Sequence, residues 1–511
     1  MVHSYPQRDI LPSGSAASDW CNQPEALQSF WPYPGNAQGI AEAIAARGAV
    51  DLARRERTAN CIRRQYAEVG IAPPEGLTAF AQGAEVVTVG HQLQAGGGPA
   101  FFHYKILSAL RWAAQLRATG TPAIAVFWMA SEDHDFEEIS RTHAPDWASF
   151  EWTPERIEQA PVGRITWDAQ AEQAWQAWCQ ATLQSTGTVH DQSMPLAHRV
   201  RHWLDEWFGD EDLVVIDGDD AELKASAHAI FEAEWTGAGI GPALHTAREQ
   251  YEAKWSSAPL QVRDNNLFIL EASGRRTRAD RWLDAQGADA VQNLRPEQLS
   301  PNASLRPLYQ EFVLESAAFV GGPSEVGYWL MLGEAFRRHQ LPHPALVVRD
   351  GAFVHDHRSL KAAEACGWTP QQPALTGDAA VALWADKQLR GNGELDVAFE
   401  AWSTALIAHA EGVPGDAVPT TRAALSKMEK ELVHVQKKWR KILRHQRAEE
   451  AEAIRSAFDH WSCPKGKGQE RHLSALPLMD AAGGREVFTE MWYRALEGTN
   501  EPQFLVFHPA S

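Results

Sequence analysis

Cysteine, long apolar runs and excess positive charge are all scarce in this sequence, and each shortage argues against a class of protein. Only five of the 511 residues are cysteines, and none lies close to another, so neither a disulfide framework nor a zinc site of paired thiols is expected. No segment approaches the roughly 18 consecutive apolar residues of a membrane helix. Residues 1–20 carry no apolar core of a secretory signal. We therefore expect a cytoplasmic protein without a membrane partner.

Lysine and arginine are outnumbered. There are 47 of them against 66 aspartates and glutamates, a net charge of −19. Nucleic acids and anionic membranes are bound through basic patches that replace counterions, so neither partner is expected, although a local basic pocket for a small anion stays open. The sequence does have 44% apolar residues and 21 tryptophans, enough for a large core, and its length allows several domains.

A strand, a glycine-rich loop, a helix and a second strand follow one another between residues 85 and 130. The apolar strand 85–89 runs into Gly90-His91-Gln92 and then Gly96-Gly97-Gly98-Pro99. A helix at about 101–117 and an apolar strand at 123–130 complete a right-handed βαβ unit. Further strands are expected at 213–216 and 344–349, and a hairpin at 261–278. The fold class is therefore α/β, with ligands expected at the carboxyl ends of parallel strands.

Five acidic side chains and one histidine crowd into the seven residues after the second strand. The run is Glu132-Asp133-His134-Asp135-Phe136-Glu137-Glu138. Like charges raise one another's pKa, so the cluster indicates function. It could ligate a divalent cation, perform acid–base chemistry through His134 or hold an ammonium group. The alternative is a solvated acidic helix start.

Two further segments carry polar groups next to glycine-rich turns. The loop from Gly90 to Pro99, with His91, Gln92 and Lys105, could hold an anion at a helix N-terminus, or it is an ordinary turn between a strand and a helix. Arg306 could clamp a carboxylate, or it forms a buried pair with a glutamate. Gly321-Gly322-Pro323 opens another helix.

The C-terminal third is predominantly helical. A helix at 394–409, a turn and a long uninterrupted helix at about 420–461 predict an antiparallel coiled-coil hairpin. The apolar seam of the long helix lapses at Gln446 and Glu449. The predicted domains are 1–375 (core), 376–463 (hairpin) and 464–511 (a segment returning to the core, with a helix at 484–496 and a strand at 503–508). The predicted seam residues are Leu425, Met428, Leu432, Val435, Trp439 and Ile442.

Over essentially its whole length the sequence resembles the bacillithiol biosynthesis cysteine-adding enzyme family, also called cysteine ligases. Val89 and Gly97 stand where that family usually has threonine, so a hydroxyl is lost at the ligand loop. The motifs that carry the resemblance are Val89-Gly90-His91-Gln92, Gly97-Gly98-Pro99, Tyr104-Lys105, Glu132 to Glu138, Ser300-Pro301-Asn302, Leu305-Arg306-Pro307, Gln310-Glu311, Gly321-Gly322-Pro323 and Gln469-Glu470-Arg471.

The resemblance implies a Rossmann-like core similar to nucleotidyltransferases, with connecting segments and a coiled-coil hairpin that mediates homodimerisation. It implies a ligase that adds cysteine to the amine of glucosaminyl-malate, the last step of bacillithiol biosynthesis. An adenine nucleotide, ATP or ADP, is associated with the family, and no metal is expected. Two alternatives stay open: a metal-dependent hydrolase using the Glu132–Glu138 cluster, and a non-catalytic scaffold using the hairpin.

The chemistry of this reaction gives each motif an expected role. His134 would accept the amine proton, Asp133 or Asp135 would hold the ammonium, and Arg306 would bind a carboxylate of malate. His91 and His134 should face one shared cavity. The expected catalytic residues are His91, Gln92, Asp133, His134 and Asp135; the substrate-binding residues are Gly90, Gly98, Tyr104, Lys105, Glu132, Asn302, Arg306, Gln310, Gly321 and Gly322; the nucleotide-binding residues are Lys465, Lys467 and Arg471.

Overall fold

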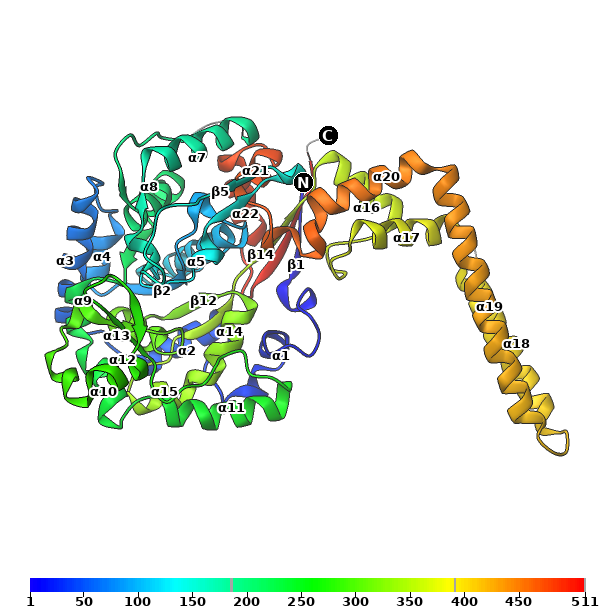
Figure 1. Ribbon diagram of the computed structural model, residues 1–511, viewed down its shortest axis with the longest axis horizontal. Helices are drawn as coiled ribbons and strands as arrows, with labels where there is room; N and C mark the ends of the chain where they lie inside the picture. The colour runs from blue at the N-terminus through cyan, green and yellow to red at the C-terminus, as the bar shows by residue number, and fades with distance from the viewer. Residues whose placement is uncertain (184–186, 390–391, 510–511) are drawn as a thin grey trace. The chain divides into compact units, whose positions relative to one another are not determined.

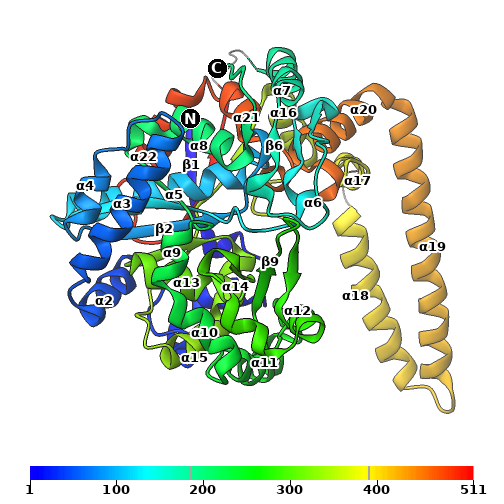
Figure 2. The ribbon, with the colours of Figure 1, turned by 60° about the vertical axis from the view of Figure 1, so that its left-hand side comes forward.

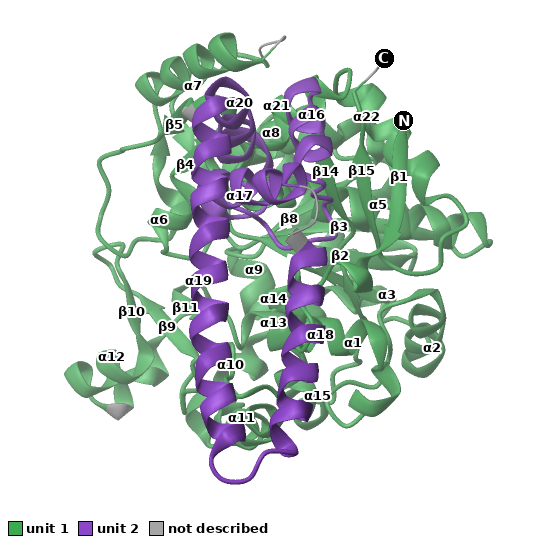
Figure 3. Cartoon of the chain, turned by 90° about the vertical axis from the view of Figure 1, so that its right-hand side faces the viewer, with its two compact units in different colours: residues 1–354, 470–511 green, residues 355–469 purple. Residues whose placement is uncertain are grey.

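The computed structural model describes residues 1–183, 187–389 and 392–509. The chain forms two compact units, one of residues 1–354 with 470–511 and the other of residues 355–469 (Figure 3). Residues 355–375, which the sequence analysis grouped with the core, and residues 464–469, which it grouped with the returning segment, lie in the second unit. Within the described ranges no helix is both long and apolar enough to cross a membrane.

A five-stranded parallel sheet forms the centre of the first unit. Its order is β13-β12-β2-β3-β8. All seven side chains of β3 are buried, because helices cover both faces of a parallel sheet and leave no polar side. The strands are β2 (Glu85–His91), β3 (Ala123–Met129), β8 (Val214–Asp217), β12 (Ala318–Gly321) and β13 (Ala345–Val348).

The strand order reverses next to β2. The chain passes from β2 to β3 and β8 on one side, then returns to β12 and β13 on the other. Helix α5 (Phe101–Ala118), which follows β2, covers one face of the sheet, and α13 (Arg306–Leu314) and α14 (Pro323–Trp329) lie on the opposite face (Figure 1). Ligands of open α/β sheets bind at the carboxyl edge at such a reversal, here between β2 and β12.

Two smaller sheets complete this unit. In the first, β15 (Gln503–Phe507) is the middle strand, antiparallel to β1 (Val2–Pro6) and parallel to β14 (Gly351–Val354). In the second, β9 (Leu267–Leu270) is flanked by β10 (Arg276–Arg278) and β11 (Leu299–Pro301), both antiparallel to it. The predicted hairpin at 261–278 therefore exists as β9 and β10. Helix α22 (Arg485–Leu496) and β15 match the predicted C-terminal helix and strand closely.

The second unit is helical. The prediction of one uninterrupted helix over 420–461 is wrong: α19 ends at Gln446, Arg447 has non-helical dihedrals (φ −120°, ψ 50°), and α20 then resumes. The break falls where the apolar seam lapses. The helices are α16 (His357–Cys366), α17 (Gly377–Gln388), α18 (Asn392–Glu411), α19 (Ala417–Gln446) and α20 (Ala448–Ala457).

Helices α18 and α19 lie side by side and run antiparallel (Figure 2). Only part of the predicted seam is covered within this chain. Leu425 is buried, whereas Met428 and Ile442 are 46% and 54% exposed, and Val435 and Trp439 are exposed as well. An apolar stripe therefore remains on the hairpin.

Candidate functional site

Polar side chains gather where β2 and β3 end. His91 ends β2 and is followed by Gln92, while Glu132, Asp133 and His134 follow β3. Because the two strands are parallel and paired along their full length, the two loops leave the sheet at the same edge. Gln92 Nε2 donates to Asp133 Oδ2 at 3.1 Å. The two segments expected to form one site are therefore in direct contact.

Arg306, the first residue of α13, binds both carboxylates of the loop after β3. Its Nε donates to Glu132 Oε1 at 2.5 Å, and its Nη2 donates to Asp133 Oδ2 at 3.0 Å. Burial disfavours the charge of Arg306, but Glu132 and Asp133 outweigh burial and raise its pKa. In this structure Arg306 is thus paired with a buried glutamate.

Asp133 is the hub of the group. Its Oδ1 accepts the backbone N–H of His134 at 2.7 Å, and its Oδ2 accepts from Gln92 and Arg306. Burial favours the neutral carboxyl, yet Arg306 and Arg276 outweigh burial and lower the pKa of Asp133. Asp133 is thus an anion with both oxygens engaged, which suits a positioning role better than the capture of a substrate ammonium.

The two carboxylate oxygens of Glu132 differ in their hydrogen bonding. The residue is 1% exposed, and its Oε1 pairs with Arg306, but its Oε2 makes no hydrogen bond to any residue that the structure describes. A buried carboxylate oxygen without a donor is unfavourable, and a substrate ammonium would supply the donor. The exposed Asp135, by comparison, stands at the start of the short helix α6 (Phe136–Ile139).

His134 contacts an arginine that the sequence analysis did not select. Arg276 Nη1 lies 2.7 Å from His134 Nδ1. The arginine is buried, with its guanidinium 4.1 Å from the ring centre of Phe268. Burial and Arg276 lower the pKa of His134, against the opposing effect of Asp133. No local motif marks Arg276, since its position depends on β10 pairing with β9.

Lys105 joins the end of β2 to the start of α14, on either side of the strand-order reversal. It is buried on α5, donates from Nζ to the Gly90 carbonyl at 3.0 Å and lies 2.5 Å from Glu325 Oε2 on α14. Glu325 also accepts the backbone N–H of Gly322 at 2.7 Å. Burial lowers the pKa of Lys105, and Glu325 opposes this shift. Lys105 therefore holds β2 and α14 together and is already paired.

His91 lies beside Lys105 at the end of β2. Burial and the charge of Lys105 lower the pKa of His91 to about 4. Its Nδ1 is 3.1 Å from the carbonyl oxygen of Gln92. His91 is therefore a neutral imidazole near neutral pH.

Glycines allow close approaches around these loops. A Cβ on Gly90 would lie 3.2 Å from Gln310 Oε1 of α13, and one on Gly321 would lie 2.7 Å from the Phe319 ring. Gly98, in the predicted anion loop, is buried and has a φ of 53°. A Cβ there would meet Gln94, so Gly98 has a clear packing role.

Several predicted residues are not brought to this group. Tyr104 is buried in the core, and its ring packs against Phe488 and Trp492 of α22. Asn302 stabilises the turn that precedes α13, because its Oδ1 accepts the backbone N–H groups of Ser304 and Leu305. The exposed Lys465 and Lys467 belong to the helical unit, and the exposed Arg471 belongs to the other unit.

One carboxylate was missed. Asp217 ends β8, next to β3, and accepts a hydrogen bond from the hydroxyl of Ser131, the residue before Glu132. Burial and Asp219 raise the pKa of Asp217 to about 6. The strand-end rule that selected the loop after β3 applies equally to β8 and could have found this residue.

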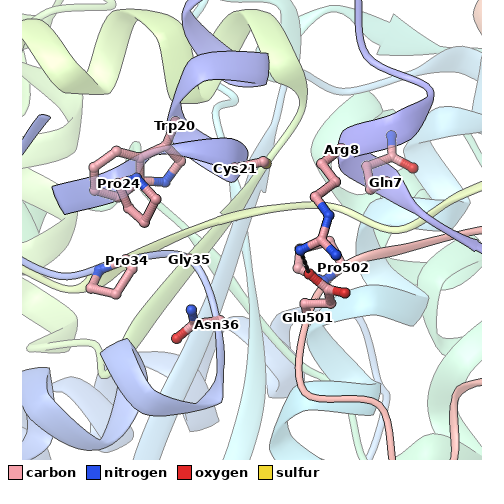
Figure 4. A pocket seen from close by; sticks show the side chains of 10 residues that line it. All are labelled: Gln7, Arg8, Trp20, Cys21, Pro24, Pro34, Gly35, Asn36, Glu501 and Pro502. Carbon is pink, nitrogen blue, oxygen red and sulfur yellow. Dashed lines mark hydrogen bonds and ion pairs between the residues drawn. The ribbon is translucent and has the colours of Figure 1, made fainter. Parts of the chain in front are cut away.

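The polar side chains at the strand ends are called the strand-end group: His91, Gln92, Lys105, Glu132, Asp133, His134, Arg276 and Arg306. A small cavity elsewhere in this unit shares no residue with this group (Figure 4). Its volume of about 30 Å³ suits one or a few water molecules. The Arg8–Glu501 ion pair, at 2.6 Å, lies along it. Burial and Glu501 raise the pKa of the Cys21 thiol there to about 12, so the thiol stays protonated. We therefore place the candidate site at the strand ends.

The acidic cluster is not arranged as a metal site. Among the described residues, no group of three or more His, Cys, Asp or Glu side chains is placed to hold a metal ion. Glu132 and Asp133 are instead paired with Arg306. Nothing in this geometry favours the hydrolase alternative.

Comparison with known proteins agrees with the motifs. The family model "Bacillithiol biosynthesis BshC, N-terminal Rossmann-like domain" matches residues 7–350. A Cytophaga hutchinsonii protein named "Putative cysteine ligase BshC" is 26% identical over 486 residues, covering 90% of this chain and 91% of its own. Proteins of the same name from Flavobacterium johnsoniae and Salinibacter ruber are 27% and 26% identical, over 68% and 69% of this chain and 69% and 70% of their own. The chain therefore belongs to the BshC family of bacillithiol biosynthesis, through its Rossmann-like domain.

Proposed function

We propose that this protein is a cytoplasmic ligase that adds cysteine to the amine of glucosaminyl-malate and so forms bacillithiol. One observation carries the proposal: the family match over residues 7–350 includes every residue of the strand-end group. The fold supports it, because the group lies where open α/β sheets bind small molecules.

Amide formation needs a neutral amine, an activated carboxylate and a way to bind the ammonium form of the substrate. Glu132 Oε2 is the proposed acceptor for that ammonium, since it is buried beside Arg306 and has no other donor among the described residues. Asp133 holds Gln92 and Arg306 in place. Gln92 is then an oriented amide at the end of β2 that can hydrogen-bond a substrate.

An adenine nucleotide is the proposed co-substrate or effector. Lys465, Lys467 and Arg471 remain the proposed phosphate ligands, because all three are exposed cations in a glycine-rich segment. No metal is included in this proposal.

The α18–α19 hairpin is proposed to form a coiled-coil contact in a homodimer. Met428, Val435, Trp439 and Ile442 are exposed on α19. A contiguous exposed apolar stripe is typical of a surface that a partner covers, and the antiparallel arrangement of the two helices suits a coiled coil.

The decisive experiment supplies purified protein with glucosaminyl-malate and isotope-labelled cysteine, with and without ATP. Mass spectrometry should detect labelled bacillithiol, and the nucleotide products should show whether ATP is consumed. Failure to form the amide under every nucleotide condition, with protein that is folded by circular dichroism, would contradict the proposal. Stoichiometric metal bound to the purified protein, whose removal by a chelator abolishes activity, would favour the hydrolase.

A deletion strain separates the enzyme from a scaffold. Loss of the gene should abolish bacillithiol and accumulate glucosaminyl-malate. Unchanged bacillithiol without that accumulation would favour a non-catalytic role for the hairpin.

A further inference from the structure

The imidazole of His134 faces a group that can only donate. Arg276 Nη1 lies 2.7 Å from His134 Nδ1. A guanidinium has five N–H donors, no acceptor, and does not lose its proton in proteins. The Nδ1 atom must therefore accept, and the single hydrogen of the neutral ring must sit on Nε2.

Arg276 cannot readily turn away from this contact. Its Nε donates to Ser300 Oγ at 2.9 Å, and its Nη2 donates to the Pro301 carbonyl at 2.5 Å, both on β11. The guanidinium also lies over the Phe268 ring of β9. These three contacts and burial fix the orientation of the guanidinium, so an N–H of Nη1 stays directed at His134.

We propose that Arg276 is a positioning residue that holds His134 as a neutral imidazole with its hydrogen on Nε2, so that His134 donates a hydrogen bond to an anionic group of the substrate. This assignment replaces the expected role of His134 as acceptor of the amine proton. The tautomer of His134 does not depend on the proposed function. Only the identity of the group that accepts its hydrogen bond does.

Protonation of His134 would occur at Nδ1, the atom that faces Arg276, and would set two donors and two positive charges against each other. The charged groups around the ring are Arg276 of β10, Arg306 of α13, and Asp133 and Asp135 of its own loop. The carboxylates favour the imidazolium, with Asp133 Oδ1 3.9 Å from Nδ1. Burial and the arginines outweigh them, and the pKa of His134 is lowered.

His91 has the complementary arrangement. Its Nδ1 lies 3.1 Å from the Gln92 carbonyl oxygen, which can only accept, so the hydrogen of His91 sits on Nδ1 and its Nε2 carries the lone pair. The two histidines therefore offer the substrate one donor, from His134, and one acceptor, from His91.

The test is the tautomer of His134 in the full chain. With ¹⁵N-histidine-labelled protein, ring nitrogens are observed by NMR from about pH 5 to about pH 8, where an unperturbed histidine titrates. His134→Asn identifies the resonances. The expected wild-type signals show a protonated Nε2 and an unprotonated Nδ1 while the ring is neutral, and the ring becomes charged at a lower pH than an unperturbed histidine. An Nδ1–H tautomer, or an imidazolium forming near the ordinary pKa of about 6.5, would overturn the proposal.

Arg276→Met should return His134 to an ordinary titration and mixed tautomers. Arg275→Met removes the same charge from the neighbouring exposed position and should leave the His134 signals unchanged. Equal spectra for Arg276→Met and wild type would also overturn the proposal. If Arg276→Met does not fold, the wild-type spectrum alone decides.

The amide-forming assay separates this inference from the proposed function. If the tautomer is as expected and no amide forms under any condition, the proposed function fails and the positioning by Arg276 stands. If bacillithiol forms while His134 titrates ordinarily, the positioning fails and the function stands.

Discussion

Two arginines, the buried Arg276 and the partly buried Arg306, balance the negative charge that Glu132 and Asp133 bring to the ends of β2 and β3. Each arginine also fixes a neighbour: Arg306 fixes the two carboxylates, and Arg276 fixes His134. Most of the side chains that the sequence analysis expected to bind substrate are therefore already hydrogen-bonded within the chain. The groups that can still hydrogen-bond a ligand are Glu132 Oε2 and the imidazoles of His91 and His134.

Replacing Glu132 by Gln tests this distribution. The substitution keeps the shape but removes a charge buried against Arg306, so we expect the free energy of unfolding to fall by about 2 kcal/mol and amide formation to be strongly reduced. Urea denaturation and the product assay measure the two effects. Glu137→Gln, at an exposed position of the same acidic run, should change neither; equal effects in both variants would contradict the role of Glu132.

Gly97→Ala tests the packing of the loop after β2. Gly97 has a φ of 78°, and a Cβ there would lie 2.7 Å from Trp207 and 2.8 Å from His103. We expect a loss of about 3 kcal/mol, from backbone strain and steric overlap together. Gly120→Ala, with a φ of 88° and open space around it, should lose only about 1 kcal/mol. Similar losses, measured by thermal denaturation, would show that overlap is unimportant.

Contacts between loops that follow adjacent parallel strands could be predicted from the sequence. Contacts with residues of a separate sheet could not. Gln92 and Asp133 were expected together because β2 and β3 are adjacent. Arg276 approaches His134 from a separate sheet, and an arginine in a short hairpin carries no mark of its future partner. Tyr104 was misplaced for a related reason, since its packing partners lie nearly four hundred residues later.

Strands and helices meet the site through their ends. The carboxyl ends of β2, β3 and β8 supply His91, the Glu132–His134 run and Asp217, and the first residue of α13 supplies Arg306. The periodicity of the apolar residues located these elements well. It failed for α19 and α20, because a shifting stripe predicts a change of helix face but does not say whether the backbone bends or breaks there.

The end of β8 should give stability a measurable pH dependence. The pKa of Asp217 is raised from 3.8 to about 6 in the folded state, so the folded protein holds this proton more tightly than the unfolded chain. The associated stability is present below about pH 4 and is lost as pH rises through about 6. Asp217→Asn cannot lose a proton, so its stability relative to wild type should rise across that window in urea denaturation.

The control for this pH series is Asp284→Asn, at an exposed position. It should run parallel to wild type over the same range. A constant difference between Asp217→Asn and wild type would contradict the raised pKa.

At the scale of the whole molecule, the two compact units carry different features. The unit of residues 1–354 and 470–511 holds the candidate site, and residues 355–469 present the apolar stripe of α19. Composition and helical spacing predicted that a helical segment interrupts the core. They did not predict that residues 355–375 belong to it, because α16 carries an ordinary amphipathic pattern that suits either unit.

Self-association should depend on that stripe. Replacing Trp439 and Ile442 by Lys removes two exposed apolar side chains from α19 and places charges in the proposed contact, so we expect a monomer. Light scattering after size-exclusion chromatography measures the mass. Lys438→Gln, on the same helix, is the control and should keep the dimer; a dimer in both variants would place the contact elsewhere.

The pairing of β14 with β15 has a consequence for biosynthesis. β14 ends at Val354, but its neighbour β15 begins only at Gln503, so a ribosome translates about 150 further residues before that sheet can close. At elongation rates of about 5 to 20 residues per second this delay is roughly eight to thirty seconds. During that interval β14 has an open edge, and the nascent chain must avoid pairing it wrongly.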